Sequence, residues 1–287
     1  MCKVIIIPNA SKLVDFDHFA RYAAEMLSCM PDGYGFVAQG VKGQFGVRTL
    51  SPMGYAQGID VPAFCESNTE SFGEVSPVTG PAMFHGRLST NTIDLLNTHP
   101  ITRDGWNLIH NGVVTNHGPK YKMNTSNDSE HVLYNLIQGG INQVGLNLTG
   151  YYAGGAIEPN GLLHVFRDSI ANLYYTYSEK LESPIFATNL ELIEDIGTYI
   201  GEELIGIKVK DNTYLIYDGS KLVSHESFTS RGYDNASAML ASKSLGRELS
   251  PIEEYQDGIS YSELDDDDAP IYREDSGMGY WAKRNIG

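Results

Sequence analysis

Cys2, the second residue of the chain, has the chemistry of a nucleophile. A thiol attacks a carbonyl carbon efficiently only after a base has removed its proton. If Met1 is removed, Cys2 becomes the first residue and carries a free α-amine, whose ordinary pKa of about 8 allows it to act as that base. The small side chain of Cys2 is compatible with removal of Met1. Taken alone, however, this cysteine can also be an accident of the translation start.

Polar clusters that interrupt strand-like segments form a second group of chemically capable residues. They are Phe84–Asn91 (FHGRLSTN), Asn97–Pro100 (NTHP), His110–Gly112 (HNG) and Asn127–Glu130 (NDSE). Each cluster also has a simpler interpretation. Asn-Gly is a strong hairpin-turn signal, Arg87 can be a surface cation, His99 can be a loop histidine, and Asp128 can be a helix cap. None of the clusters assigns a function by itself.

Composition and charge describe an ordinary globular protein. The 287 residues are 41% hydrophobic, and 20 Lys and Arg against 36 Asp and Glu give a net charge of -16. Because phosphate binding needs clustered cations, we expect neither a nucleic acid nor an anionic membrane as the main partner.

The cysteines give no sign of a metal or disulfide framework. Cys2, Cys29 and Cys65 show no CxxC or CxxH spacing, so we expect no metal and no cofactor, and a reducing cytoplasm as the compartment. The apolar run Ile5–Ile7 ends at once in Pro8, which predicts no signal peptide and no transmembrane helix.

Periodicity predicts a strand-rich chain with a few helices. The expected strands are Lys3–Ile7, a hairpin of Phe36–Ala38 with Phe45–Leu50, several short runs within Ala82–Thr115, then Tyr151–Glu158, Leu162–Asp168, Leu173–Ser178 and Ile185–Thr188, and a final meander of Gly206–Val209, Thr213–Tyr217 and Lys221–His225. The expected helices are Asp15–Met30 with Asp15 or Asp17 as cap, a helix opened by a capping box at Asn127–Glu130 and stopped at Gly139, and a turn or two at Leu190–Ile196. Ser51–Gly80 is expected to be mostly loop, with one short helix.

The character of the sequence changes after Phe228. A helix is expected at Ala236–Ser244, but the acidic run Glu263–Asp268 cannot be buried. We therefore expect two regions: a folded domain at 2–228 and an acidic extension at 229–287 that is partly disordered or docks on a partner or on the domain.

The order of the clusters resembles the class II glutamine amidotransferases, the N-terminal-nucleophile (Ntn) hydrolases that include the glutaminase domains of glucosamine-phosphate synthase, amidophosphoribosyltransferase and asparagine synthetase. Six motifs carry the resemblance in the family's order: Cys2, Pro31–Gly35 (PDGYG), His85–Thr90 (HGRLST), Asn97–Pro100, His110–Gly112 and Asn127–Glu130. They cover residues 2 to about 225, and their versions look closest to the stand-alone branch of the family. The resemblance implies an α+β fold, the four-layer α/β/β/α sandwich of two antiparallel sheets.

The resemblance also implies a role for each site residue. Cys2 would attack the side-chain amide of glutamine, form a γ-glutamyl thioester and release ammonia. The Asn111 amide and the Gly112 N–H would bind the oxyanion, a role in which one donor is typically worth about 10²–10³-fold in rate. The remaining roles are Arg87 on the glutamine α-carboxylate, Asp128 on its α-ammonium, Thr90 in the pocket wall, and His85, His99 and His110 as supporting groups behind the site.

Two positions depart from the family pattern. Leu88 replaces a frequent Trp after the Arg, and Asn91 replaces a frequent His after the Thr. Both lie in a segment that closes over the substrate in relatives, so the packing of that lid is an open question. The nucleophile, the oxyanion donors and the glutamine-binding charges are unaffected.

Three functions remain open from the sequence. The first is ammonia release from glutamine, with transfer to an acceptor expected on a separate synthetase, because the residues after Phe228 are too few for a further synthetase module. The second is hydrolysis of other γ-glutamyl amides or peptides, which Arg87 and Asp128 would bind through the same glutamyl head. The third is an inactive binding module, which retention of Met1 would favour because it blocks the amine of Cys2.

Overall fold

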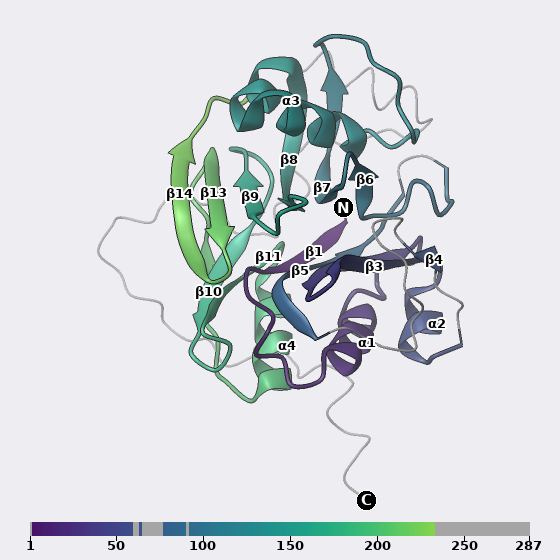
Figure 1. Cartoon of the computed structure of the whole chain (residues 1–287), viewed down its shortest axis with the longest axis vertical. Coiled ribbons are helices and arrows are strands. Elements are labelled where there is room, and N and C mark those ends of the chain that lie inside the picture. Colours follow the sequence, from purple (N-terminus) through teal and green to yellow (C-terminus); the bar gives the residue numbers. More distant parts are fainter. Residues whose placement is uncertain (1, 60–62, 65–76, 90–91, 233–287) are drawn as a thin grey trace, which may run out of the picture. The chain divides into compact units, whose positions relative to one another are not determined.

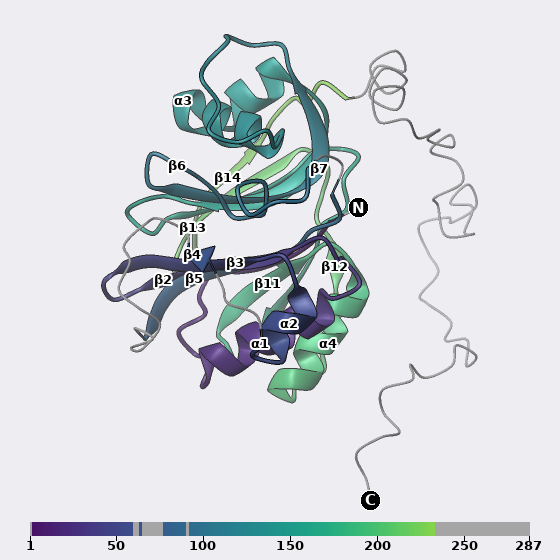
Figure 2. The ribbon, with the colours of Figure 1, turned by 90° about the vertical axis from the view of Figure 1, so that its right-hand side faces the viewer.

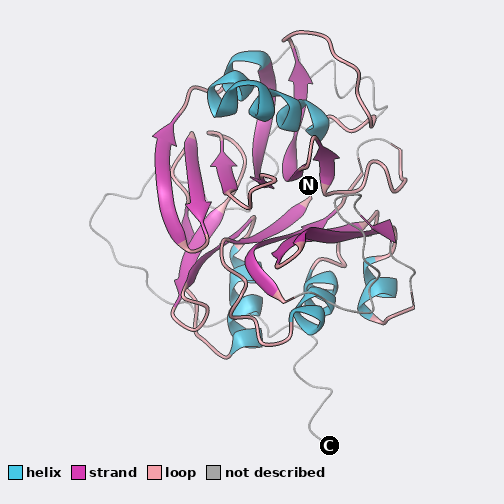
Figure 3. Cartoon of the chain, viewed as in Figure 1, coloured by secondary structure: helices cyan, strands magenta, loops and turns pink. Residues whose placement is uncertain are grey.

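The computed structural model describes residues 2–59, 63–64, 77–89 and 92–232. Within them, two antiparallel sheets lie face to face and helices cover the outer face of each sheet (Figures 1 and 2). Figure 3 shows the same order of layers by secondary structure. The predicted α+β class and its α/β/β/α layering are confirmed.

The first sheet has eight strands in the order β12-β10-β11-β1-β5-β2-β3-β4. Its strands are β1 (Lys3–Ile7), β2 (Tyr34–Gly40), β3 (Gly43–Thr49), β4 (Ala63–Phe64), β5 (Val78–Gly86), β10 (Tyr174–Ser178), β11 (Ser183–Ala187) and β12 (Ile207–Lys208). The strand that carries Cys2, β1, therefore lies in the middle of the sheet, between β5 and β11.

The second sheet has six strands in the order β14-β13-β9-β8-β7-β6. Its strands are β6 (Ile101–Arg103), β7 (Trp106–Asn116), β8 (Leu148–Ile157), β9 (Leu163–Arg167), β13 (Thr213–Asp218) and β14 (Lys221–Ser227). β7 packs across β1 and β5 of the first sheet, which brings the His110–Gly112 cluster over the strand that leads to Cys2.

The helices divide between the two outer faces. α1 (Phe16–Met26), α2 (Pro52–Ala56) and α4 (Leu190–Ile200) lie on the first sheet, and α3 (Ser129–Asn147) lies on the second (Figure 2). α3 is kinked at Gly139 and Gly140, where the backbone leaves helical geometry. In the part of the chain that the structure describes, no helix is long and apolar enough to span a membrane.

Alternate side chains of β1 belong to two different hydrophobic layers. Ile5 and Ile7 pack toward the helices, whereas Val4 and Ile6 pack between the two sheets, and all four are fully buried. A strand buried on both faces reads as a continuous apolar run. Complete burial of each such side chain contributes about 1.5–3 kcal/mol, so the strand that precedes the site is firmly held.

The predicted start of the helix at 15–30 is confirmed, but the helix ends at Met26, earlier than predicted. Asp15 caps α1 by accepting a hydrogen bond from the His18 N–H at 2.9 Å. After Met26 the backbone turns more tightly, with the Ser28 N–H donating to the Glu25 carbonyl at 3.1 Å. This three-residue spacing ends the helix before the PDGYG turn.

Two further predictions are wrong. The expected final meander is split: β12 pairs with β10 at the edge of the first sheet, while β13 and β14 form a hairpin in the second sheet. The alternative interpretation of His110–Gly112 as a hairpin turn also fails, because these residues lie inside β7 and pair with β8. The helix expected at 236–244 and the acidic run lie outside the described residues.

Candidate active site

Cys2 lies one residue before β1, beside the end of β5. Lys3 pairs with Gly86 in the antiparallel register, so Cys2 faces the residues that follow β5. The Leu88 N–H donates to the Cys2 sulfur at 3.4 Å, and the Cys2 thiol lies 3.5 Å from the Leu88 carbonyl oxygen. The main chain of one residue, Leu88, therefore offers a donor to the thiolate and an acceptor to the thiol.

Burial raises the pKa of the Cys2 thiol above its ordinary value. The Leu88 N–H and the positive charge of Arg87 lower this pKa, whereas the carboxylate of Asp128 raises it. These effects show that Arg87 and Asp128 lie close enough to Cys2 to act on it electrostatically. At neutral pH the sulfur is a thiol, and it needs a base before it can attack.

The Arg87 segment is fixed by main-chain hydrogen bonds to the PDGYG turn. The Asp32 N–H donates to the Arg87 carbonyl at 3.1 Å, and the Arg87 N–H donates to the Gly33 carbonyl at 2.8 Å. The Asp32 carboxylate accepts from the Ser89 N–H at 2.7 Å. The guanidinium of Arg87 donates to the Thr92 carbonyl at 2.7 Å, and the side chain is almost fully buried. The PDGYG motif thus sets the position of the cation next to Cys2.

Asp128 lies at the start of α3 and is tied to β7. Its Oδ2 accepts a hydrogen bond from the Val114 N–H at 2.8 Å. Burial raises the pKa of the Asp128 carboxyl to about 6, against the opposing effects of main-chain hydrogen bonds and of Arg87. The site therefore holds an acidic group that is ionised at neutral pH and becomes neutral only slightly below it.

Asn111 and Gly112 lie in the middle of β7. The Asn111 side chain is buried, and its Oδ1 has no hydrogen-bond partner within the described ranges. A Cβ on Gly112 would lie 2.0 Å from the Tyr151 carbonyl oxygen and 2.5 Å from His110 Nε2. Neither contact is sterically tolerable, so only glycine fits where β7 passes β8 at this point.

The three histidines of the motifs are buried between the two sheets. The rings of His85 and His99 stack with centroids 3.9 Å apart, and His85 Nε2 lies 3.1 Å from the His110 carbonyl oxygen. Desolvation lowers the pKa of His85 to about 3 and that of His110 to about 4, and it also lowers the pKa of His99. All three rings are therefore neutral near pH 7, and they connect the two sheets behind the site.

The NTHP and NDSE loops are hydrogen-bonded to each other. The Asn127 side chain donates to the Asn97 carbonyl at 2.7 Å, and the Asn97 Oδ1 accepts from the Ser126 N–H at 3.0 Å. The PDGYG turn packs on the same loop, since a Cβ on Gly35 would lie 2.1 Å from the His99 carbonyl oxygen. Motifs separated by up to about a hundred residues thus form one continuous scaffold.

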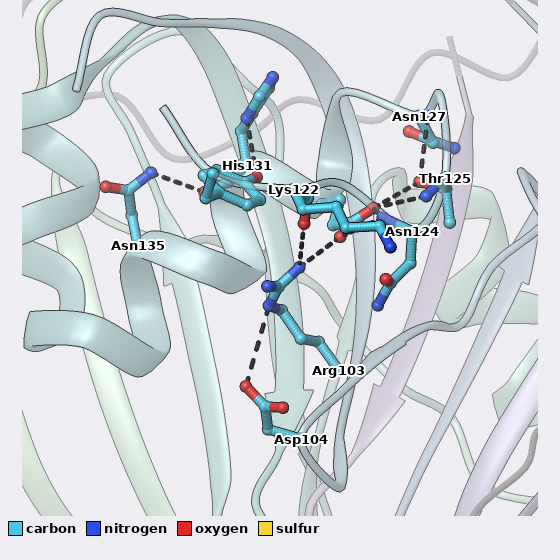
Figure 4. Close-up of polar contacts among 10 residues, drawn as sticks. Arg103, Asp104, Lys122, Asn124, Thr125, Asn127, His131 and Asn135 are labelled. Carbon is cyan, nitrogen blue, oxygen red and sulfur yellow. Dashed lines mark hydrogen bonds and ion pairs between the residues drawn. The ribbon is translucent and has the colours of Figure 1, made fainter. Parts of the chain in front are cut away.

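Glu130 does not complete a capping box, so that prediction is wrong. The N-cap of α3 is Asp128, and it makes no side-chain cap hydrogen bond. The fully buried carboxylate of Glu130 instead accepts from Arg103 at 2.6 Å and from the N–H groups of Asn124 and Thr125. Figure 4 labels three of the residues that donate to this carboxylate, namely Arg103, Asn124 and Thr125. The last residue of the NDSE motif therefore anchors the loop that precedes α3.

Cys2 contacts the main chain of Leu88 next to Arg87, and both Arg87 and Asp128 act on the Cys2 thiol electrostatically. Asn111 and Gly112 lie on the strand that carries the hydrogen-bond partner of Asp128. The pocket residue Thr90 and the divergent Asn91 lie outside the described residues. The sequence drew attention to Leu88 only because of its side chain. In the structure, the main-chain N–H and carbonyl oxygen of Leu88 contact the sulfur. A main-chain contact leaves no signal in a sequence motif. No group of three metal-ligating side chains occurs within the residues described by the structure.

Comparisons with known proteins support the fold. No protein-family model matches the sequence, and no curated protein sequence matches it. A glutamine phosphoribosylpyrophosphate amidotransferase from B. subtilis, complexed with ADP and GMP, is similar in structure, with a TM-score of 0.54 at 18% identity, covering 79% of this chain and 49% of that one. A structure described as the allosteric regulatory enzyme of purine biosynthesis is similar with a TM-score of 0.54 at 17% identity over 79% and 49%. This chain spans about half the length of these structures, and it shares the fold of the matched half.

Proposed function

We propose that this chain is a glutamine amidotransferase domain in which Cys2 is the nucleophile. The proposal is carried by one observation: the Cys2 sulfur contacts the main chain of the residue that follows the buried cation Arg87, within electrostatic range of that cation and of the Asp128 carboxylate. A free amino acid has a carboxylate and an ammonium on the same carbon. A fixed cation and a fixed anion next to a thiol are complementary to that pair of charges.

The reaction begins when the α-amine of Cys2, exposed by removal of Met1, takes the thiol proton. The sulfur then bonds to the side-chain amide carbon of glutamine, and the Asn111 amide and the Gly112 N–H stabilise the oxyanion that forms. The C–N bond breaks as the nitrogen receives the proton, ammonia leaves, and a γ-glutamyl thioester remains. Water cleaves the thioester, which gives glutamate and restores the thiol.

Arg87 binds the α-carboxylate of the substrate, Asp128 binds its α-ammonium, and Thr90 lines the pocket. His85, His99 and His110 stay neutral and support the site from behind. The catalytic domain comprises 2–228, and the extension 229–287 lies beyond it. The ammonia is used by an acceptor on a separate protein.

The test combines intact mass with ammonia release. The active protein is expected to lack Met1, and a processed Cys2→Ala variant is expected to lose at least about 10⁴-fold of its glutaminase activity, because the nucleophile is gone. Cys29→Ala is the matched control, since Cys29 is exposed and not part of the site, and it should keep full activity. Undiminished activity of the processed Cys2→Ala variant, or activity with Met1 retained, would overturn the mechanism. A higher kcat/KM for γ-glutamyl peptides than for glutamine would move the assignment to a γ-glutamyl hydrolase.

A further inference from the structure

Ser129, the third residue of the NDSE motif, lies between two imidazole rings. Its Oγ is 3.0 Å from His99 Nε2 and 2.8 Å from His110 Nδ1. The residue is almost fully buried at the first position of α3. One hydroxyl group thus joins the histidine of the NTHP loop to a histidine on β7.

The hydroxyl couples the tautomers of these two histidines. Ser129 has a single hydroxyl proton, and both rings are neutral, so it donates to one ring and accepts from the other. If it donates to His110 Nδ1, then His99 carries its proton on Nε2. If it donates to His99 Nε2, then His110 carries its proton on Nδ1. The two rings cannot choose their tautomers independently.

The ring nitrogens that face away from Ser129 do not select between these two arrangements. His110 Nε2 and His99 Nδ1 are both buried without a hydrogen-bond partner among the described residues. The Tyr151 oxygen and His110 Nε2 both border the position where a Cβ of Gly112 would lie. In each arrangement one of these two ring nitrogens carries a proton, and Ser129 joins both rings in either case.

The tautomer of His85 is fixed by its hydrogen bond to the main chain. His85 Nε2 donates to the His110 carbonyl at 3.1 Å. His85 Nδ1 is likewise buried without a partner in the described part of the chain. An unpartnered ring nitrogen costs less as a bare acceptor than as a buried N–H.

We propose that Ser129 is a positioning residue that joins the rings of His99 and His110 in a hydrogen-bond chain, and thereby fixes the part of β7 that carries Asn111 and Gly112. His85 holds the carbonyl of the peptide group between His110 and Asn111, and Ser129 holds the ring of His110, so this peptide is fixed from two sides. Its role in catalysis rests on the proposed function, because Asn111 and Gly112 matter there as oxyanion donors.

The hydroxyl bridge is tested on the wild-type protein without any activity assay. A long-range ¹H–¹⁵N spectrum of the uniformly labelled full chain near pH 7, with ring nitrogens assigned through their ring protons, reports the tautomer of each histidine. We expect His85 to carry its proton on Nε2, and we expect His99 and His110 to carry theirs either both on Nε2 or both on Nδ1. Opposite tautomers of His99 and His110 would overturn the bridge.

The positioning role is tested by kinetics of two variants. Ser129→Ala is expected to lower kcat for glutamine about tenfold, the effect of losing one fixed hydrogen bond, while KM changes less than about twofold because Arg87 and Asp128 are untouched. Ser129→Thr keeps the hydroxyl and should recover kcat to within about threefold of the wild type. A Ser129→Ala variant with wild-type kcat, or a Ser129→Thr variant as impaired as Ser129→Ala, would overturn the role.

Ser183→Ala is the matched control for a general loss of packing. Ser183 is a fully buried serine of β11 whose Oγ accepts from the Asn9 N–H at 3.0 Å, beyond the opposite end of β1 from Cys2. Its substitution should lower stability and leave kcat unchanged. If the wild type releases no ammonia although its histidine tautomers are as expected, the proposed function fails while the hydrogen-bond chain stands.

Discussion

The two halves of the candidate site are held in place by different means. The half on the first sheet, with Cys2 and Arg87, is fixed mainly by hydrogen bonds of the main chain. The Leu88 N–H donates to the Cys2 sulfur, and the Arg87 N–H donates to the Gly33 carbonyl. The half on the second sheet, with Asn111 and Asp128, is backed by buried side chains, among them three histidines, Ser129 and Glu130.

This difference predicts different tolerance to substitution. A position whose main chain makes the contact can change its side chain, so the contact of Leu88 with the sulfur does not depend on the type of side chain at this position. A half that depends on buried side chains loses its geometry when any one of them is shortened, because each polar atom left without its partner costs about 1–3 kcal/mol. The following predictions test that contrast.

The largest effect is expected for Asn111 in the second half. Asn111→Ala should lower kcat for glutamine about 10²–10³-fold with little change in KM, because it removes a donor that acts on the transition state. Asn116→Ala, at the far end of the same strand, is the control and should leave kcat unchanged. Steady-state ammonia release measures both, and equal kcat values for the two variants would remove Asn111 from the oxyanion site.

A smaller effect is expected for the first half, and only from its main chain. Leu88→Pro removes the N–H that donates to Cys2 and should lower kcat/KM about 10- to 100-fold. The substitution suits the backbone, because Arg87 is in a β-bridge and residues before proline prefer extended conformations. Leu88→Ala keeps the N–H and should stay within about threefold of the wild type. If the alanine variant is as impaired as the proline variant, the side chain rather than the peptide group matters.

The smallest effect is a pH dependence that arises from Asp128. Burial raises the pKa of this carboxyl to about 6, and only the ionised form attracts the substrate ammonium. As pH falls below 6 the group becomes neutral, so kcat/KM for glutamine should fall up to about tenfold per pH unit, while above pH 6 this loss is absent. Asp128→Asn should have a lower kcat/KM and no acid limb with this pKa. An unchanged acid limb in that variant would assign the titration to another group.

Local sequence patterns correctly predicted the elements that depend on hydrophobic periodicity and helix capping. The apolar run of β1 and the capped, amphipathic helix after Asp15 were found at their positions, and the layered architecture followed from the resemblance of the ordered motifs. The placement of β12 failed, because an edge strand of two residues has almost no periodicity and takes its partner from β10, about 30 residues earlier. Edge pairing of this kind is decided by tertiary contacts rather than by sequence pattern.

For the site, residue types were easier to predict than their contacts. The motifs pointed to Cys2, Arg87 and Asp128, and Arg87 and Asp128 lie within electrostatic range of Cys2, while the roles of all three and of Thr90 stay predictions. The capping box failed because the Glu130 carboxylate meets stronger donors in Arg103 and the loop N–H groups than a helix terminus offers. A carboxylate close to a guanidinium generally prefers it to a single peptide N–H.

The central position of β1 has a consequence for how the protein is made. Ile5 pairs with Ala187, so β1 acquires its second neighbour only after the strands that lie between them in the sequence have been synthesised. Contacts this distant in sequence form late in folding. The strand that positions Cys2 is therefore completed late, after most of the strands that enclose it have been made.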